Sequence, residues 1–410
     1  MPALANDTIT TETQIAFALK LARMLHRYGT PTHRLEDAMA QVLGRLGIEG
    51  IVFSIPTGIF AGFGPAEAQR TAVIRADLGQ IHLEKLAMLE ALVRHVTSGE
   101  IDVEEADRQL DAIAARPARY GAPLRFVCFA VASATAARSF GGGWREVLVA
   151  AVIGVITGGL MALAGRAENA RRISETLAAI IAGALVVTVS RVVFPASTYI
   201  PMIAGLIVLV PGLMLTTAVT ELATRNLVSG TARLTGAVMV FLELGIGAAL
   251  GGQIGRLLPD APHVQRTASL LPEWTLYPAL LLAPAAFAVL FRTAPRDIVW
   301  VMVTGIAGFA GARLGSLLLG PALGTFVGAV LIGLLGNFLA RALKRPSTLL
   351  LVPGIVFLFP GSFGFGSFSK FIENDILSGI TIAFELVLAT VALVTGLLLA
   401  NAILPPRRAL

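Results

Sequence analysis

Polar side chains follow two Pro-Gly pairs that interrupt long apolar runs of the sequence. A proline inside an apolar helix breaks its hydrogen-bond ladder, and the freed backbone groups are tolerated where protein or a water-filled cavity satisfies them. A half-helix N-terminus can hold a carboxylate, and a glutamate nearby can pair with an amine. These residues therefore form a candidate binding site for a small zwitterion: Pro211, Gly212, Thr216, Thr217 and Glu221 at the first break, and Pro360, Gly361 and Ser362 at the second. The alternative is that the hydroxyls bond to their own helices and Glu221 lies in an interfacial loop.

Two further carboxyl groups, Glu243 and Glu385, lie well inside apolar runs. An unpaired carboxylate is costly in a bilayer, so each should face a cavity, pair with a partner or be protonated. Both are candidate proton carriers. A hydrogen-bonded structural role is the alternative for each.

Signatures of enzymes and pumps are missing from the sequence. There is no HExxH, no serine or aspartate pair with a plausible histidine in the apolar runs, and no GxxxxGK[ST] phosphate loop. The single cysteine, Cys128, excludes an intrachain disulfide, and no histidine has metal-ligand spacing. We expect neither an enzyme nor a cofactor, although a channel remains open because channels and carriers share broken helices.

The composition is that of a polytopic membrane protein. Of the 410 residues, 55% are hydrophobic and 14% are charged, against roughly 25% charged residues in soluble domains. The formal net charge of +6 comes from arginines in short loops between apolar runs, where they set membrane orientation. We therefore expect no nucleic-acid partner. The partners expected are a small-molecule substrate, protons and the lipid bilayer, with a homo-oligomer possible.

Residues 1–120 form a different kind of segment, with 12 Lys and Arg against 15 Asp and Glu. Helical periodicity between positions 15 and 46, interrupted at Tyr28-Gly29-Thr30-Pro31, predicts two helices, with Thr30 capping the second and Pro31 in its first turn. Alternation from 51 to 76 predicts three antiparallel strands, and two more helices follow near 81–96 and 103–115. We predict a cytoplasmic α+β domain. His33, Arg34 and Glu36, near the start of the second helix, can receive an anion or a partner.

After Pro123 the sequence predicts about ten membrane spans, of which the fourth and ninth are broken. Gly205 to Gly212 returns 149 positions later as Gly354 to Gly361, and Leu227-Val228-Ser229-Gly230 returns at the same offset as Ile376-Leu377-Ser378-Gly379. Two matches at one offset indicate a duplication. Five spans is an odd number, so two copies, 121–258 and 272–405, form an inverted 5+5 repeat, an architecture typical of transporters.

Loop charges give the orientation. With the N-terminus inside, the inner segments hold twelve of the Lys and Arg residues and the outer segments seven. The N-terminal domain and the C-terminus are then cytoplasmic. Glycines at helical spacing, such as Gly247, Gly251 and Gly255, predict close helix packing.

Together these residues resemble a known family. The segment Leu25-His26-Arg27-Tyr28-Gly29-Thr30-Pro31-Thr32-His33-Arg34-Leu35-Glu36, followed by Leu46-Gly47-Ile48, is similar to the start of threonine/serine exporter (ThrE) proteins. So are Pro211-Gly212 with the later Glu221 and Ser229-Gly230, and the second Pro-Gly near the end. The likeness covers nearly the whole chain, in the order of a soluble domain, five spans and five related spans. Where the family often has Asp, this chain has Glu221.

The resemblance implies a secondary exporter of L-threonine and L-serine in the cytoplasmic (inner) membrane, driven by the proton motive force. The chain also resembles a two-subunit bacterial relative that is linked to succinate export. Export of succinate or related dicarboxylates is therefore the alternative function, and a channel is a further one.

Overall fold

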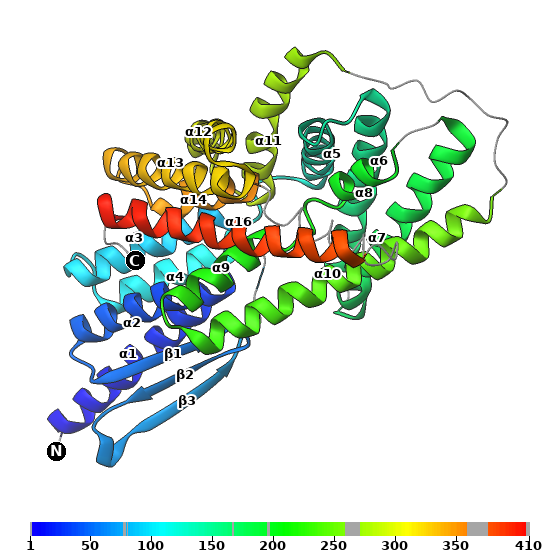
Figure 1. Cartoon of the computed structure of the whole chain (residues 1–410). Coiled ribbons are helices and arrows are strands. Elements are labelled where there is room, and N and C mark those ends of the chain that lie inside the picture. Colours follow the sequence, from blue (N-terminus) through cyan, green and yellow to red (C-terminus); the bar gives the residue numbers. More distant parts are fainter. Residues whose placement is uncertain are drawn as a thin grey trace.

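The chain folds into a mostly helical molecule with one small sheet near its N-terminus (Figure 1). This computed structural model describes residues 2–406 except 77–78, 80, 166–167, 195–196, 259–270 and 359–375. The N-terminal unit comprises α1 (Pro2–Arg27), α2 (Thr32–Leu46), β1 (Gly50–Ile55), β2 (Gly58–Phe63), η1 (Ala66–Ala68), β3 (Arg70–Arg75), α3 (Leu83–Ser98) and α4 (Val103–Ala115). Apolar side chains of its helices and of β1 and β2 form one core.

The predicted helix pair and three-stranded antiparallel sheet are confirmed. The strands lie in the order β1-β2-β3, with Ile55 opposite Gly58 and Ile59 opposite Ile74. Gly29, at φ +95°, turns the chain between α1 and α2, because glycine adopts this backbone conformation without a Cβ clash. The predicted cap was wrong. Pro31 occupies the N-cap position of α2, so the cap carries no side-chain hydrogen bond, and the Thr30 hydroxyl is buried without a partner in the described structure.

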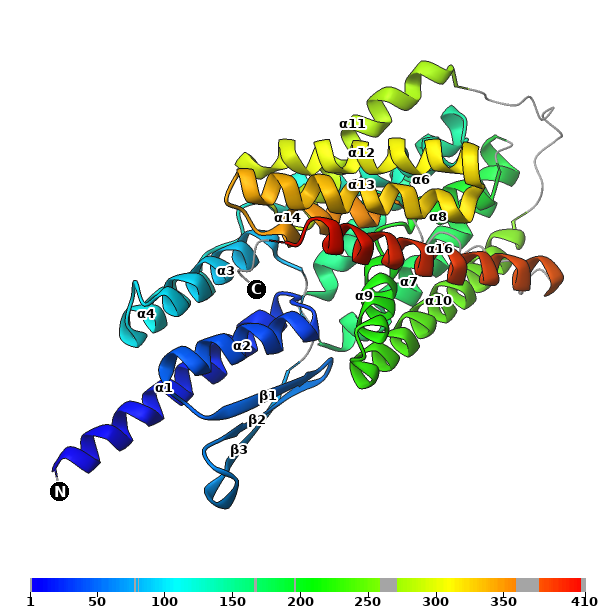
Figure 2. The ribbon, with the colours of Figure 1, turned by 60° about the vertical axis from the view of Figure 1, so that its left-hand side comes forward.

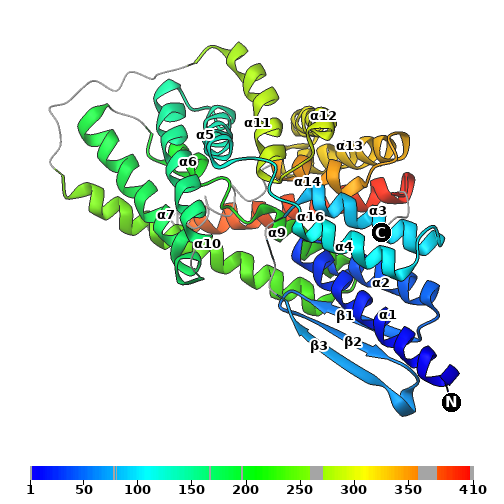
Figure 3. The ribbon, with the colours of Figure 1, turned by 180° about the vertical axis from the view of Figure 1, so that it is seen from behind.

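The remaining helices form a bundle beside this unit. They are α5 (Ala122–Ser139), α6 (Trp144–Ala164), α7 (Glu168–Thr188) with the π-helical turn η2 (Val189–Val193), α8 (Tyr199–Gly205), α9 (Gly212–Ala223), α10 (Leu227–Arg256), η3 (Glu273–Thr275), α11 (Leu276–Leu290), α12 (Pro295–Leu319), α13 (Pro321–Ala342), α14 (Ser347–Phe357) and α16 (Ile376–Ile403). α12, α13 and α16 lie side by side (Figure 2), and α7 packs along α10 (Figure 3).

The bundle is that of a polytopic helical membrane protein, and the count of ten spans stays a prediction. Within the described residues, seven helical segments are long and apolar enough to cross a membrane: Trp144–Ala164, Ile173–Val193, Leu227–Arg256, Glu273–Leu290, Pro295–Leu319, Leu323–Ala342 and Leu377–Ile403. α5 is not among them, because its arginines, serines and many alanines lower its hydropathy. The fourth span is divided into α8 and α9 at Pro211-Gly212, and α14 is a short apolar helix.

Glycines let these helices approach closely, as was predicted from glycines at helical spacing. A Cβ on Gly251 of α10 would collide with the Ile180 carbonyl oxygen of α7, and one on Gly315 of α12 would lie 2.8 Å from Val327 of α13. Contacts this short leave no room for a side chain, so the glycines serve packing.

The N-terminal unit is joined to the bundle through its third helix. The backbone N–H groups of Leu83 and Glu84, in the first turn of α3, donate to the carbonyl oxygens of Phe291 (3.0 Å) and Arg292 (3.1 Å), just after α11. Donors at a helix N-terminus have no partner within their own helix, so α11 supplies acceptors for α3.

Candidate functional site

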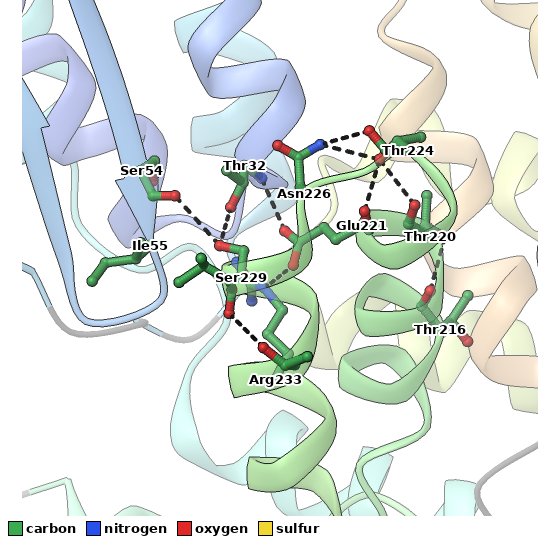
Figure 4. Close-up of polar contacts among 12 residues, drawn as sticks. Thr32, Ser54, Ile55, Thr216, Thr220, Glu221, Thr224, Asn226, Ser229 and Arg233 are labelled. Atoms are coloured by element: carbon green, nitrogen blue, oxygen red, sulfur yellow. Dashed lines mark hydrogen bonds and ion pairs between the residues drawn. The ribbon is translucent and has the colours of Figure 1, made fainter.

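A buried polar network connects α2 of the N-terminal unit with α9 and α10 of the bundle (Figure 4). Glu221, in the last turn of α9, has no exposed surface and forms an ion pair with Arg233 of α10, with 2.9 Å between Oε2 and Nε. Its other oxygen, Oε1, accepts a hydrogen bond from the backbone N–H of Thr32 at 3.1 Å. Glu221 therefore caps α2 from another part of the chain, in place of the missing side-chain cap.

The same network includes two serines. The Thr32 and Ser229 hydroxyls lie 2.8 Å apart, and the Ser229 hydroxyl also donates to the carbonyl oxygen of Ser54 at 3.4 Å. All three side chains are buried. We call Glu221, Arg233, Thr32, Ser229 and Ser54 the junction network. It holds the start of α2 and the end of β1 against the first half of the bundle.

A cavity of about 110 Å³ lies beside this network, where the N-terminal unit meets both halves of the bundle. We call it the junction cavity. Its polar lining comes from α2 (His33, Arg34), α9 (Thr216, Thr217, Thr220), α14 (Thr348) and α16 (Asn401), and apolar residues of α9, α14 and α16 complete the wall. Cavities for drug-sized ligands hold roughly 300–1,000 Å³, so this one suits a small solute.

Arg34 is the cationic group of the junction cavity. Its Nη1 donates to the Thr348 hydroxyl at 2.6 Å, and that hydroxyl donates to Oε1 of Glu90, in α3, at 3.2 Å. Glu90 is buried, and burial raises its pKa to about 7, although Arg34 and the Thr348 hydrogen bond act against the shift. Glu90 therefore gains and loses a proton near neutral pH. It is hydrogen-bonded to Thr348, which lines the cavity.

The other ionisable group of the lining, His33, stays neutral. Burial, followed by the nearby Arg34, lowers its pKa to about 4, and its Nδ1 atom has no hydrogen-bond partner in the described structure. The described lining thus presents one guanidinium, one neutral imidazole, hydroxyls and an amide. Groups of these kinds can bind a carboxylate and neighbouring hydroxyl or amine groups.

Only some of the predicted site residues line the junction cavity. Thr216 and Thr217 line the junction cavity, but the Thr216 hydroxyl donates to the carbonyl oxygen of Gly212 at 2.9 Å, as the alternative interpretation expected. Glu221 is not in an interfacial loop. It lies behind the cavity with Arg233 as its partner. Pro360, Gly361 and Ser362 lie outside the described residues.

The two candidate proton carriers lie apart from the cavity. Glu243 is half-buried on α10, within electrostatic range of Glu175 on α7, whereas Glu385 is exposed on α16. A Cβ on Gly247, one turn after Glu243, would lie 2.7 Å from the Thr176 carbonyl oxygen, so α10 and α7 pack closely beside the two acidic residues. The proton-carrier role of Glu243 and Glu385 stays a prediction.

Sequence reasoning missed several residues of the site. Glu175, Glu90, Arg233 and Thr348 are 12 to 258 positions from their partners in the chain, so no local spacing connects them. The pairing of Glu221 with Arg233 could have been predicted from the sequence. Arg233 is a charged residue in an apolar stretch twelve residues after Glu221, and a buried carboxylate needs a counter-charge. Arg34, which was predicted from its place near a helix start to receive an anion, lies in the cavity lining, and its role as an anion receptor stays a prediction.

Family comparisons cover both halves of the chain. The family described as "Putative threonine/serine exporter" matches residues 16–255, and the one described as "Threonine/Serine exporter, ThrE" matches residues 279–403. No solved structure matches the chain.

Curated relatives come from fungi. Pheromone-regulated membrane protein 10 of Saccharomyces cerevisiae is 27% identical over 93% of this chain and 49% of the relative, and its namesake in Pichia sorbitophila is 26% identical over 90% of this chain and 38% of the relative. An uncharacterised protein of Schizosaccharomyces pombe is 28% identical over 90% of this chain and 49% of the relative. The chain thus spans half or less of the length of these relatives. The family matches extend from the junction network to α16, and the chain belongs to the threonine/serine exporter family.

Proposed function

We propose that this chain is a secondary exporter of L-threonine and L-serine, driven by the proton motive force, and that the junction cavity holds the substrate. One observation carries the proposal: a solute-sized cavity lies where the N-terminal unit, α9 of the first half and α14 and α16 of the second half meet. Transporters bind their substrates between repeats, beside broken helices. In this cavity Arg34 binds the substrate carboxylate, and Thr217 contacts the hydroxyl or amine.

The architecture behind this proposal is an inverted repeat of residues 121–258 and 272–405, preceded by a cytoplasmic domain of residues 1–120. Matching contacts support it. Glu146, at the start of α6, accepts from the Ser197 backbone N–H at 2.9 Å, two residues before α8. Asp297, at the start of α12, lies 3.4 Å from Nε of Arg345, two residues before α14. A carboxylate at the start of α6 and one at the start of α12 thus each contact a residue two positions before a short helix. In the proposed repeat α11 is the counterpart of α5, and these two helices pack against each other.

Proton coupling is part of the same proposal. Glu90 takes up a proton beside Arg34 and Thr348, on the side of the cavity that faces the N-terminal unit. Glu243, near Glu175, and Glu385 are the candidates deeper in the bundle. With the N-terminal unit and the C-terminus in the cytoplasm of a cell whose inner membrane holds the chain, Glu90 would titrate with cytoplasmic pH.

Succinate or a related dicarboxylate is the second candidate substrate. The described lining contains Arg34 and His33 but no carboxylate that would pair with an amine. Such a lining suits a dicarboxylate, because a dicarboxylate has negative charges for Arg34 to bind and no amine that needs a carboxylate partner.

Counterflow of labelled threonine, serine and succinate into proteoliposomes, with and without a pH gradient, tests the proposal. Threonine exchange that saturates and is driven uphill by the gradient is expected. Thr217→Val should raise the KM for threonine, while Thr235→Val, an exposed threonine of α10 bonded to its own helix, should leave it unchanged. Exchange of succinate alone would favour the second candidate, and flux that does not saturate would indicate a channel.

A further inference from the structure

A second, larger cavity shares no described lining residue with the junction cavity. Its volume is about 770 Å³. It is bounded by the end of α1, the end of β3, the start of α3, the segment after α4 and the turn between α11 and α12. We call it the basic cavity, because six of its lining residues are cationic: Arg23, Arg27, Arg75, Lys85, Arg116 and Arg292.

The described lining of the basic cavity contains no carboxylate. Within the described residues, Arg23, Arg27 and Arg75 form no ion pair. The buried Lys85 donates to the carbonyl oxygen of Ala114 at 2.9 Å and lies over the ring of Tyr28, so it is held in place without a counter-charge. The described side chains around the cavity therefore form no ion pair with three of its arginines, Arg23, Arg27 and Arg75.

One described acidic side chain beside the cavity is already engaged. Glu84, beside Lys85 on α3, is bound through both oxygens by Arg119, at 3.2 Å from Nε to each. This hydrogen bonding is the main cause that lowers the pKa of Glu84. Glu84 thus remains charged but is compensated by an arginine that does not line the cavity.

Burial and neighbouring cations lower the pKa of two residues of the basic cavity, His82 and Arg292. Burial, then Arg292 and Lys85, lower the pKa of His82 to about 4, although Glu84 acts in the opposite direction. Burial and the neighbouring Arg125 lower the pKa of Arg292 as well. Cations at such close quarters repel one another, and a bound anion removes that repulsion.

The geometry points to a binding site for a multiply charged, phosphate-bearing anion in the basic cavity, held jointly by the N-terminal unit and the turn between α11 and α12. Arginine forks match phosphate oxygens, and several of them around one cavity match an anion of more than two charges. A dicarboxylate carries fewer charges and fills far less than 770 Å³. A soluble phosphate compound and a phospholipid headgroup share this chemistry, and the cavity adjoins membrane helix α11.

Calorimetric titration of the purified full-length protein with inorganic pyrophosphate, at constant ionic strength, tests the site. We expect saturable binding, with succinate binding much more weakly. The double variant Arg27→Gln/Arg75→Gln should weaken pyrophosphate binding by about tenfold or more, since each charge-assisted contact contributes about that factor. Both side chains are exposed and without ion pairs in the described structure, so the variant should fold.

The matched control is Arg45→Gln/Arg108→Gln, which removes the same charge from exposed positions of α2 and α4 outside the cavity. It should bind pyrophosphate like the unmodified protein. Equal weakening in both double variants, or heat that depends on ionic strength alone, would overturn the proposal.

The source of the phosphate is separated by repeating the titration in nanodiscs. If phosphatidylglycerol, but not phosphatidylcholine, competes with pyrophosphate, and the cavity variant abolishes this difference, the lipid headgroup is the ligand. If pyrophosphate binds equally in both lipids and the cavity variant still weakens it, the ligand is soluble. Neither result depends on threonine transport, so the binding site and the proposed function can fail separately.

Discussion

The N-terminal unit meets the membrane helices at two places of opposite character. At the junction network and junction cavity, protein groups compensate the charges: Arg233 pairs with Glu221, and Arg34 bonds to Thr348, which bonds to Glu90. At the basic cavity, six cations share a space seven times larger with no carboxylate in the described lining. The first arrangement suits the binding and release of a small solute, as proposed above, and the second suits an anion that brings negative charge to the arginines.

The strongest test of this contrast is Glu221→Gln. It leaves Arg233 buried without a counter-charge and should lower the free energy of unfolding by about 3–5 kcal/mol. Thermal unfolding in detergent measures the loss. The double variant Glu221→Gln/Arg233→Met should recover most of it, because both buried charges are then absent. A Glu221→Gln protein of normal stability without transport would instead assign Glu221 to the substrate amine.

A second test removes the cation of the junction cavity. Arg34→Gln should lower kcat/KM for threonine on the order of 10- to 100-fold, the contribution of one hydrogen bond to a charged group. Arg45→Gln, at the exposed end of the same helix, should transport normally. Pyrophosphate binding should be unchanged in both, and a loss of that binding in Arg34→Gln would mean that the two cavities are coupled.

A third test concerns the pH dependence of the junction. The folded pKa of Glu90, about 7, lies above its ordinary value, so the folded state keeps a proton that the unfolded chain has released. The contribution of Glu90 to stability is therefore largest below about pH 4.5 and falls as the pH rises to about 7. Glu90→Gln should abolish this decline in thermal unfolding. At pH 7 about half of the carboxyls are protonated, so transport should change by no more than about twofold there. An unchanged pH profile would contradict the role of Glu90.

The smallest expected effect is at the basic cavity without ligand. Arg75→Gln should slightly raise the melting temperature at low salt, because it removes repulsion among cations. The gain should vanish at high salt, where exposed charges are screened. A lower melting temperature would show that Arg75 has a partner that stabilises the fold.

Much of the fold follows from periodicity, and less of the site does. The break at Tyr28 to Pro31, the three strands and the interruption at Pro211-Gly212 were predictable, because turns and helix ends depend on a few adjacent residues. The count of ten spans stays a prediction, because α5 and the two pieces of the broken fourth span, α8 and α9, are not identified as crossing helices by length and composition. The pairing of Glu221 with Thr32, 189 positions apart, depends on how α2 docks on α9, which no local pattern records.

The basic cavity illustrates the same limit. Its cations come from α1, β3, α3, the segment after α4 and the turn after α11, and each looks like an ordinary surface charge in the sequence. Only the packing of α3 against the end of α11 brings Arg292 to the others. The charge count of residues 1–120 gives a slightly acidic balance for the segment as a whole. It does not predict the local excess of positive charge in the basic cavity.

The hydrogen bonds from Leu83 and Glu84 to the carbonyl oxygens of Phe291 and Arg292 have a mechanical consequence. They join the first turn of α3 to the end of α11, so α3 cannot be displaced without either moving the end of α11 or breaking both hydrogen bonds. α11 in turn packs against α5, in the other half of the bundle. α3, which carries Glu90 and Lys85, is therefore connected through α11 to α5 by direct contacts at each step.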